Sequence, residues 1–160
     1  MKELVGTVVV FGLGFSLAAC SSSSGGSDGG AGGGGTAPAI SISSPANGAS
    51  VAVTKPNDNV SLAFATTNFT LAAPGMCGSQ ASTDNCGHIH VLVDGTSCTP
   101  SGSPYNNDAT ASPATAILSS CPMASGSHKA TLELHHDDHS PIQVNGATVS
   151  ASVTFAATGG

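Results

Sequence analysis

Apolar and polar residues alternate in a series of short segments from residue 39 onward, and this pattern constrains the possible fold most strongly. The segments are residues 39–43, 51–53, 60–65, 88–93, 114–118, 129–135 and 148–155. In residues 129–135, for example, Ala130, Leu132 and Leu134 share one face, because successive side chains of a strand point to opposite sides. Turn residues such as Asn47 and Gly48 lie between the segments. The sequence therefore predicts an all-β fold, an antiparallel β-sandwich of about seven strands.

The N-terminal segment ends at residues 17–20 in Leu-Ala-Ala-Cys, which resembles the lipobox of bacterial lipoproteins. The apolar run before Cys20 has the length of a signal peptide and is shorter than the roughly 20 residues that a spanning helix needs. The resemblance implies that residues 1–19 are removed and that Cys20 carries acyl chains that anchor the protein to the cell envelope. Ser21 favours the outer membrane by the same resemblance. The alternative is an uncleaved N-terminal anchor.

The rest of the chain divides into a linker and one domain. Residues 20–37 are predicted to hold the lipidated cysteine and a flexible linker rich in Ser and Gly. Residues 38–160 are long enough for one domain with its own core. Within it, residues 42–51 (Ile-Ser-Ser-Pro-Ala-Asn-Gly-Ala-Ser-Val) look like the first strand and turn of bacterial immunoglobulin-like domains. That resemblance implies an immunoglobulin-like β-sandwich.

The charge balance excludes several partners. Charged residues make up only 8% of the chain, with 3 basic against 9 acidic side chains. This composition argues against nucleic acid and against binding to anionic lipid through charge. Trp is absent and Tyr occurs once, which disfavours recognition through large aromatic anchors. The expected partners are the membrane, reached through the N-terminal lipid, and a protein or glycan that the sequence does not identify.

The cysteines of the domain are even in number and predict disulfides. They are Cys77, Cys86, Cys98 and Cys121. Four cysteines allow three pairings, and an oxidising compartment favours disulfides over free thiols. We favour Cys77–Cys86 and Cys98–Cys121, because each pair closes an irregular loop. A thiolate metal site is the alternative, but the sequence holds no Cys-x-x-Cys motif.

Histidines carry the main chemical signal. All 6 lie between residues 88 and 139: His88, His90, His128, His135, His136 and His139. His88 and His90 fall on one face of a predicted strand. If segments 88–93 and 129–135 are antiparallel neighbours, the end of the second lies beside the start of the first. This pairing would bring His88 and His90 near His135, His136 and His139, and place His128 at the opposite end of the sheet.

Clustered imidazoles with nearby carboxylates suit copper or zinc. Binding needs neutral rings, so it is expected to weaken as the pH falls towards 6. The segments around Gly87–Val91 and Gly126–Pro141 are also similar to a group of little-characterised secreted bacterial domains. In their pattern the matching positions are His88, His90, His128 and His139. The alternative is a polar strand face whose histidines only form hydrogen bonds.

Three classes of function follow from these patterns. We expect a lipid-anchored binding module of the cell envelope, not an enzyme, that binds copper or zinc through its histidines. A structural or adhesive surface module without metal is the second hypothesis. A copper-dependent dismutase is a third, because those enzymes also combine a β-sandwich, a His-x-His pair and a disulfide. This chain departs from that family because it has no arginine and no histidine between His90 and His128.

Overall fold

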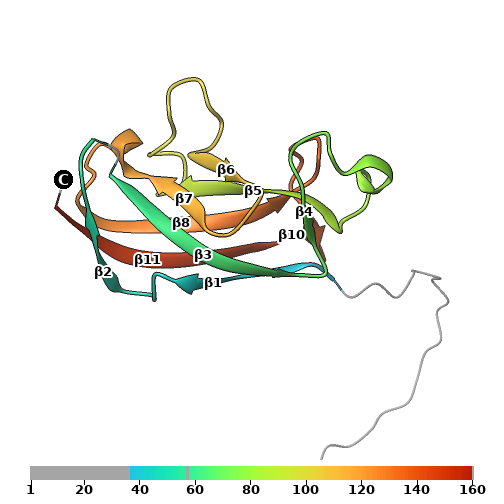
Figure 1. The fold of residues 1–160 in the computed structure, drawn as a ribbon, viewed down its shortest axis with the longest axis horizontal. Coiled ribbons are helices and arrows are strands. Elements are labelled where there is room, and N and C mark those ends of the chain that lie inside the picture. The colour runs from blue at the N-terminus through green and yellow to red at the C-terminus, as the bar shows by residue number, and fades with distance from the viewer. Residues whose placement is uncertain (1–36, 57, 160) are drawn as a thin grey trace, which may run out of the picture. The chain divides into compact units, whose positions relative to one another are not determined.

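Two β-sheets pack face to face to form the domain (Figure 1). The computed structural model describes residues 37–56 and 58–159. One sheet has the order β1 (Ala39–Ser44), β3 (Asn59–Thr67), β7 (Ala114–Ile117). The other has the order β2 (Ala49–Val53), β11 (Ser150–Gly159), β8 (Gly126–His135), β5 (Cys86–Val93), β4 (Thr70–Leu71), with β6 (Asn107–Ala109) also paired to β5. The predicted leader, Cys20 and the linker up to residue 36 lie outside the described residues.

The remaining elements are short. β9 (Gln143–Val144) and β10 (Ala147–Thr148) form a small hairpin, and two 3-10 helices, η1 (Gly78–Gln80) and η2 (Leu118–Ser120), lie in loops. Among the residues that the structure describes, no helix has the length and apolar character to cross a membrane.

The sheet order confirms the predicted all-β, immunoglobulin-like sandwich. β1 pairs antiparallel with β3 in one sheet, whereas β2 runs parallel to β11 in the other, so the start of the domain contributes to both layers. Two pairings depart from the predicted antiparallel arrangement, because β2–β11 and β4–β5 are parallel. The strands β4, β6, β9 and β10 were not predicted, because a strand of two or three residues is too short to show an alternation of apolar and polar side chains.

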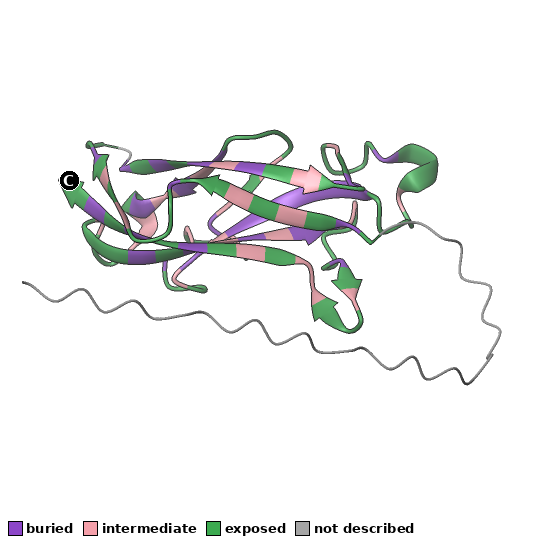
Figure 2. Cartoon of the chain, turned by 90° about the horizontal axis from the view of Figure 1, so that it is seen from below, coloured by how far each residue is buried: buried purple, intermediate pink, exposed green. Residues whose placement is uncertain are grey.

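Alternation along the strands builds the core, as Figure 2 shows by colour. On β3, the predicted inward residues Val60, Leu62 and Phe64 are buried, and their neighbours Ser61 and Ala65 are not. On β5 the pattern differs, because both faces of the strand are covered. Ile89, Val91 and Val93 face the core, and the opposite face carries the histidines. β5 is thus a strand whose outer face is also buried.

Ala37 lies close to the connection between β3 and β4. Its carbonyl accepts a hydrogen bond from Asn68 Nδ2 (3.2 Å), and the carbonyl of Asn68 accepts one from Asn85 Nδ2 (2.8 Å). Asn85 immediately precedes β5. The chain therefore enters the domain at the end where β5 begins (Figure 1).

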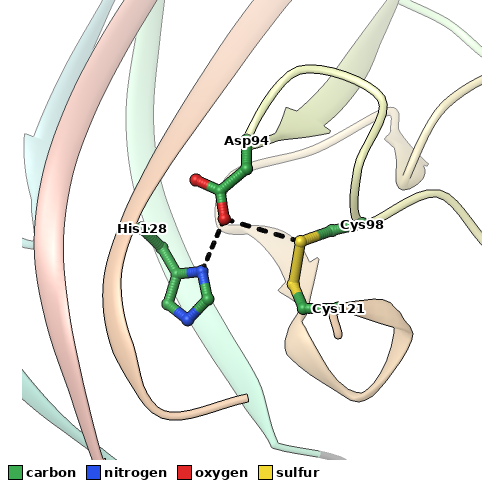
Figure 3. Close-up of side chains that lie close together, drawn as sticks. All are labelled: Asp94, Cys98, Cys121 and His128. Atoms are coloured by element: carbon green, nitrogen blue, oxygen red, sulfur yellow. Dashed lines mark hydrogen bonds and ion pairs between the residues drawn. A yellow bond between two sulfur atoms is a disulfide. The ribbon is translucent and has the colours of Figure 1, made fainter. Parts of the chain in front are cut away.

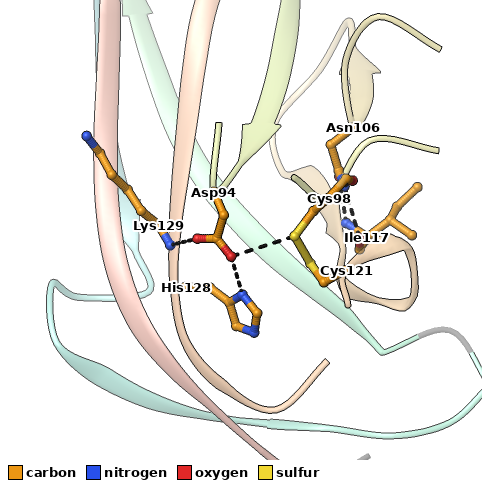
Figure 4. The surroundings of a disulfide bond; sticks show 7 residues. All are labelled: Asp94, Cys98, Asn106, Ile117, Cys121, His128 and Lys129. Atoms are coloured by element: carbon orange, nitrogen blue, oxygen red, sulfur yellow. Dashed lines mark hydrogen bonds and ion pairs between the residues drawn. A yellow bond between two sulfur atoms is a disulfide. The ribbon is translucent and has the colours of Figure 1, made fainter. Parts of the chain in front are cut away.

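The cysteines pair as Cys77–Cys86 and Cys98–Cys121, the pairing that the loops favoured. Beside the second disulfide, the side chain of Asn106 joins the loop at Cys98 to the end of β7 at Ile117 (Figure 4). Asn106 Nδ2 donates to the carbonyl oxygens of Cys98 (2.6 Å) and Ile117 (2.9 Å), and Oδ1 accepts from the backbone N–H of Ile117 (2.8 Å). A single buried amide thus satisfies three backbone groups.

We expect Asn106→Ala to lower the free energy of unfolding by about 3 kcal/mol, because it leaves buried backbone groups without partners. Denaturant unfolding would measure this loss. The matched control is Asn107→Ala, which removes one half-buried bond to the carbonyl of Thr115 (3.1 Å) and is expected to cost about 1 kcal/mol. Equal losses in the two variants would contradict the role assigned to Asn106.

Candidate metal centre

Three ring nitrogens converge on the outer face of β5. His88 Nε2 lies 3.0 Å from His90 Nε2, and His139 Nδ1 lies 3.1 Å from each of them. We call these residues the three-histidine cluster. Each offers one nitrogen to a common point, which is the arrangement needed to hold a metal ion. The sequence predicted all three of these residues as ligands.

The pairing of β5 with β8 explains why His88 and His90 meet there. The two strands are antiparallel neighbours as predicted, with His88 opposite His135 and His90 opposite Glu133. Strand alternation then points both imidazoles away from the core. Loops cover this face, so His88 is 0% and His90 5% exposed. The two rings are therefore fixed on a rigid strand and shielded from water.

His139 comes from the turn after β8. The turn is closed by hydrogen bonds from the backbone N–H of His136 to the carbonyl of Ser140 and from that of His139 to the carbonyl of His136. The hydroxyl and the backbone N–H of Ser140 both donate to Asp138 Oδ1 (2.5 and 2.9 Å), and these two bonds lower the pKa of Asp138. His139 has φ +67°, a left-handed conformation that the turn must hold in place. His139 is thus positioned by a turn and not by a strand.

The surroundings of His88 and His90 favour the neutral form of these two rings. Burial, followed by the neighbouring His135, His88 and His139, lowers the pKa of His90 to about 3. Burial, followed by His139 and His135, also lowers the pKa of His88. Neutral imidazole is the form that binds a metal.

The spacing also fits a metal. The three nitrogens could surround an ion at metal–nitrogen distances of about 2.0–2.1 Å, and three protein ligands would leave further positions on such an ion open. Without a metal, three mutually close ring nitrogens cannot all be paired, because each hydrogen bond needs one donor and one acceptor. A cation at their centre would satisfy all three lone pairs at once.

The other two predicted ligands, His135 and His136, lie outside the cluster. The ring of His135 stacks on His90 (centroids 3.7 Å apart), its Nδ1 donates to the carbonyl of His139 (2.8 Å), and its Nε2 lies 3.3 Å from Glu133 Oε2. Both ring nitrogens of His135 are therefore engaged elsewhere. His136 Nε2 lies 3.3 Å from Asp84 Oδ1. The sequence placed these residues at the correct end of the sheet but could not show which way each ring points.

Tyr105 also belongs to this region, and the sequence analysis did not identify it. Its ring lies 3.8 Å from that of His90, centroid to centroid. Burial, followed by the nearby Asp108, raises the pKa of Tyr105. A hollow of about 480 Å³ opens beside these rings; it is lined by His90, Leu92, Pro104, Tyr105, Glu133, His135 and His139. Two of the cluster's ligands thus border a space that can admit a small molecule. The one signal in the sequence that could have pointed to Tyr105 is that the chain has a single tyrosine.

A second group of potential ligands lies at the other end of β8, where the sequence placed His128 (Figure 3). His128 Nδ1 is 2.8 Å from Asp94 Oδ2, and Cys98 Sγ is 3.6 Å from the same oxygen. Cys98 is bonded to Cys121, so its sulfur carries no hydrogen and no thiolate is present. In this state the group is a hydrogen bond between His128 and Asp94 beside a disulfide. His128, which the resemblance to secreted domains grouped with the other histidines, does not join them.

Comparisons with known proteins give a structural neighbour only. No family model matches the chain, and no curated protein matches it. Among solved structures, it is similar to the fibronectin(III)-like modules of Clostridium thermocellum CbhA, with 12% sequence identity and a TM-score of 0.41. The match covers 74% of this chain and 95% of the module. The fold and the cluster together define the class: an immunoglobulin-like sandwich with a histidine group that could hold a metal ion.

Proposed function

We propose that this protein is a metal-binding module that holds one copper(II) or zinc ion through His88, His90 and His139. The convergence of three ring nitrogens within 3.1 Å of one another carries this proposal. Imidazole ligands suit both ions, and copper(II) is expected to bind more tightly than zinc. The open positions on the metal would allow an exogenous ligand to enter from the hollow beside Tyr105.

Burial of His88 and His90 changes the pH dependence that we expect for metal binding. The sequence alone suggested weaker binding as the pH falls towards 6. The lowered pKa values of His88 and His90 mean that protons compete for these two rings only at lower pH. We therefore expect metal affinity to persist further into the acid range than it does for exposed histidine pairs.

The test is metal uptake by purified protein at neutral pH, with copper and zinc supplied separately. We expect about one equivalent to bind and to raise the stability by about 2.7 kcal/mol when the free metal is 100 times the dissociation constant. His88→Ala/His90→Ala is expected to lose both effects. The control is His128→Ala, which removes a histidine at the other end of β8 and should leave uptake unchanged. A folded wild-type protein that takes up neither metal would refute the proposal.

The location of this activity is a second part of the proposal. The lipobox resemblance at residues 17–20 supports a lipid anchor at Cys20 and a place on the cell envelope, with the outer membrane favoured. Metabolic labelling with a palmitate analogue would test it, with Cys20→Ala as the unlabelled control. Absence of label on the wild-type chain in its own host would contradict the anchor.

A structural or adhesive surface module without metal is the second candidate. The immunoglobulin-like sandwich and the 8% charged residues fit such a module. This candidate predicts that His88→Ala/His90→Ala leaves partner binding unchanged. The metal proposal instead predicts that the same variant abolishes a stoichiometric uptake.

A further inference from the structure

We propose that Asp137 and the Cys77–Cys86 disulfide position His139, so that the metal affinity of the three-histidine cluster depends on whether this disulfide is closed. The inference rests on the proposed function and names a regulation of the same site. It begins from an asymmetry among the ligands: His88 and His90 belong to β5, whereas His139 belongs to a turn. The pairing of β8 with β5 places the start of this turn, and contacts from outside the turn help to fix His139 relative to β5.

Asp137 supplies one connection between the turn and the loop that precedes β5. Its Oδ1 accepts a hydrogen bond from the backbone N–H of Gly75 (2.9 Å), and its Oδ2 accepts one from that of Cys77 (3.4 Å). A second connection runs from His136 Nε2 to Asp84 Oδ1, 3.3 Å apart. Figure 1 shows this loop and the turn after β8 side by side at one end of the domain. Two residues of the turn, Asp137 and His136, thus contact the loop of residues 73–85.

The disulfide joins that loop to the strand that carries the other two ligands. Cys86 is the first residue of β5 and lies two positions before His88. Its partner Cys77 is also the residue whose backbone N–H is bonded to Asp137. A short path therefore runs from His88 through Cys86, Cys77 and Asp137 to His139. Every link in it is a covalent bond or a hydrogen bond.

The loop has little else to hold it in place. Among residues 73–85, all of which the structure describes, Cys77 is the only buried residue. Segments with few buried contacts open locally at low free-energy cost. Opening the disulfide would leave Cys77, and with it the partner of Asp137, attached to β5 only through an exposed chain. His139 would then lose one of its connections to β5 and keep two others, the bond of its carbonyl to His135 Nδ1 and the contact of His136 with Asp84.

The redox step is an ordinary thiol–disulfide exchange. A dithiol reductant transfers two electrons and two protons to the Cys77–Cys86 bond, which becomes two thiols, while the reductant becomes a disulfide. Zinc has no redox chemistry, so a bound zinc ion would keep its oxidation state in this step. In this proposal, reduction acts on the cluster through the position of His139.

The two disulfides of the domain allow a matched test. Cys77→Ser/Cys86→Ser removes the disulfide that joins the loop to β5, and Cys98→Ser/Cys121→Ser removes the disulfide beside His128. Copper(II) affinity would be measured by competition with a chelator, together with the electron paramagnetic resonance spectrum of the bound ion. We expect the first variant to bind about 10–100-fold more weakly, as for losses of groups that orient metal ligands, with an altered spectrum. The second should retain both the affinity and the spectrum of the wild type.

Asp137→Ala keeps the test independent of disulfide loss. It leaves both disulfides intact and is expected to weaken copper binding in the same direction, with partial rescue by Asp137→Asn, which keeps one oxygen acceptor. Circular dichroism of the metal-free proteins would show that the sandwich is folded. Wild-type affinity in both Asp137→Ala and Cys77→Ser/Cys86→Ser would overturn the inference while leaving the metal site intact. No copper binding by the wild type would overturn the proposed function and the inference with it.

Discussion

Gly87→Ala is expected to destabilise the domain by about 3 kcal/mol or more and to disrupt the three-histidine cluster at the same time. A Cβ built on Gly87 would collide with the carbonyl oxygen of His135 on the neighbouring strand. Glycine in a strand marks such close approaches of two backbones. Backbone cannot rotate away as a side chain can, so β5 and β8 would have to separate. Because His88 follows Gly87 and pairs with His135, the separation would displace a ligand.

Denaturant unfolding and copper titration would measure the two effects of Gly87→Ala. Gly48→Ala is the control, because Gly48 has φ +79° but nothing within 4 Å of the added Cβ. That variant isolates the strain of a side chain in the left-handed region, about 1–2 kcal/mol, and should leave the copper affinity unchanged. If Gly87→Ala were no less stable than Gly48→Ala, the close approach of β5 and β8 would not be what requires this glycine.

The second large effect is a loss of folding stability at acid pH. Metal-free protein is expected to lose stability as the pH falls from 6.5 towards 3, by up to about 1.4 kcal/mol per pH unit from His90 alone. The folded state holds the pKa of this ring at about 3, whereas the unfolded chain has the ordinary value of 6.5. Between these values the unfolded chain binds a proton that the folded protein does not. Acid therefore favours unfolding, and the stability is fully present only above pH 6.5.

The comparison of wild type with His90→Gln would isolate this contribution. Several titratable groups surround the ring and remain in both proteins: His88, Tyr105, Asp108, Glu133, His135 and His139. Urea unfolding in the presence of a chelator, at a series of pH values between 6.5 and 3.5, would give the two slopes. We expect a shallower slope for His90→Gln. Equal slopes would show that burial does not hold His90 neutral.

Strand alternation was enough to predict most of this fold. Period-2 patterns at β3, β5 and β8 located the strands that form the centre of the sandwich, and the same period placed His88 and His90 on one face. The neighbouring position of β5 and β8 followed from an immunoglobulin-like order. Parallel pairing of β2 with β11 could not be predicted, because alternation marks a strand's faces and not its direction.

The details of the site depended on turns and loops, which follow no period. His135 continues the outward alternation of β8, yet its ring stacks on His90 and does not join the nitrogens of the cluster. His136 lies beyond the strand, where its direction is set by Asp84, a residue far away in the sequence. Tyr105 reaches His90 from the loop between β5 and β6. Each of these positions is decided by contacts between distant segments, and a single sequence does not show them.

Ala37 lies at the same end of the domain as the three-histidine cluster. Ala37 is bonded to Asn68, and Asn68 to Asn85, just before the strand that carries His88 and His90. The end of the domain where the described chain begins is therefore also the end that carries the three-histidine cluster, and His128 and Cys98 lie at the opposite end.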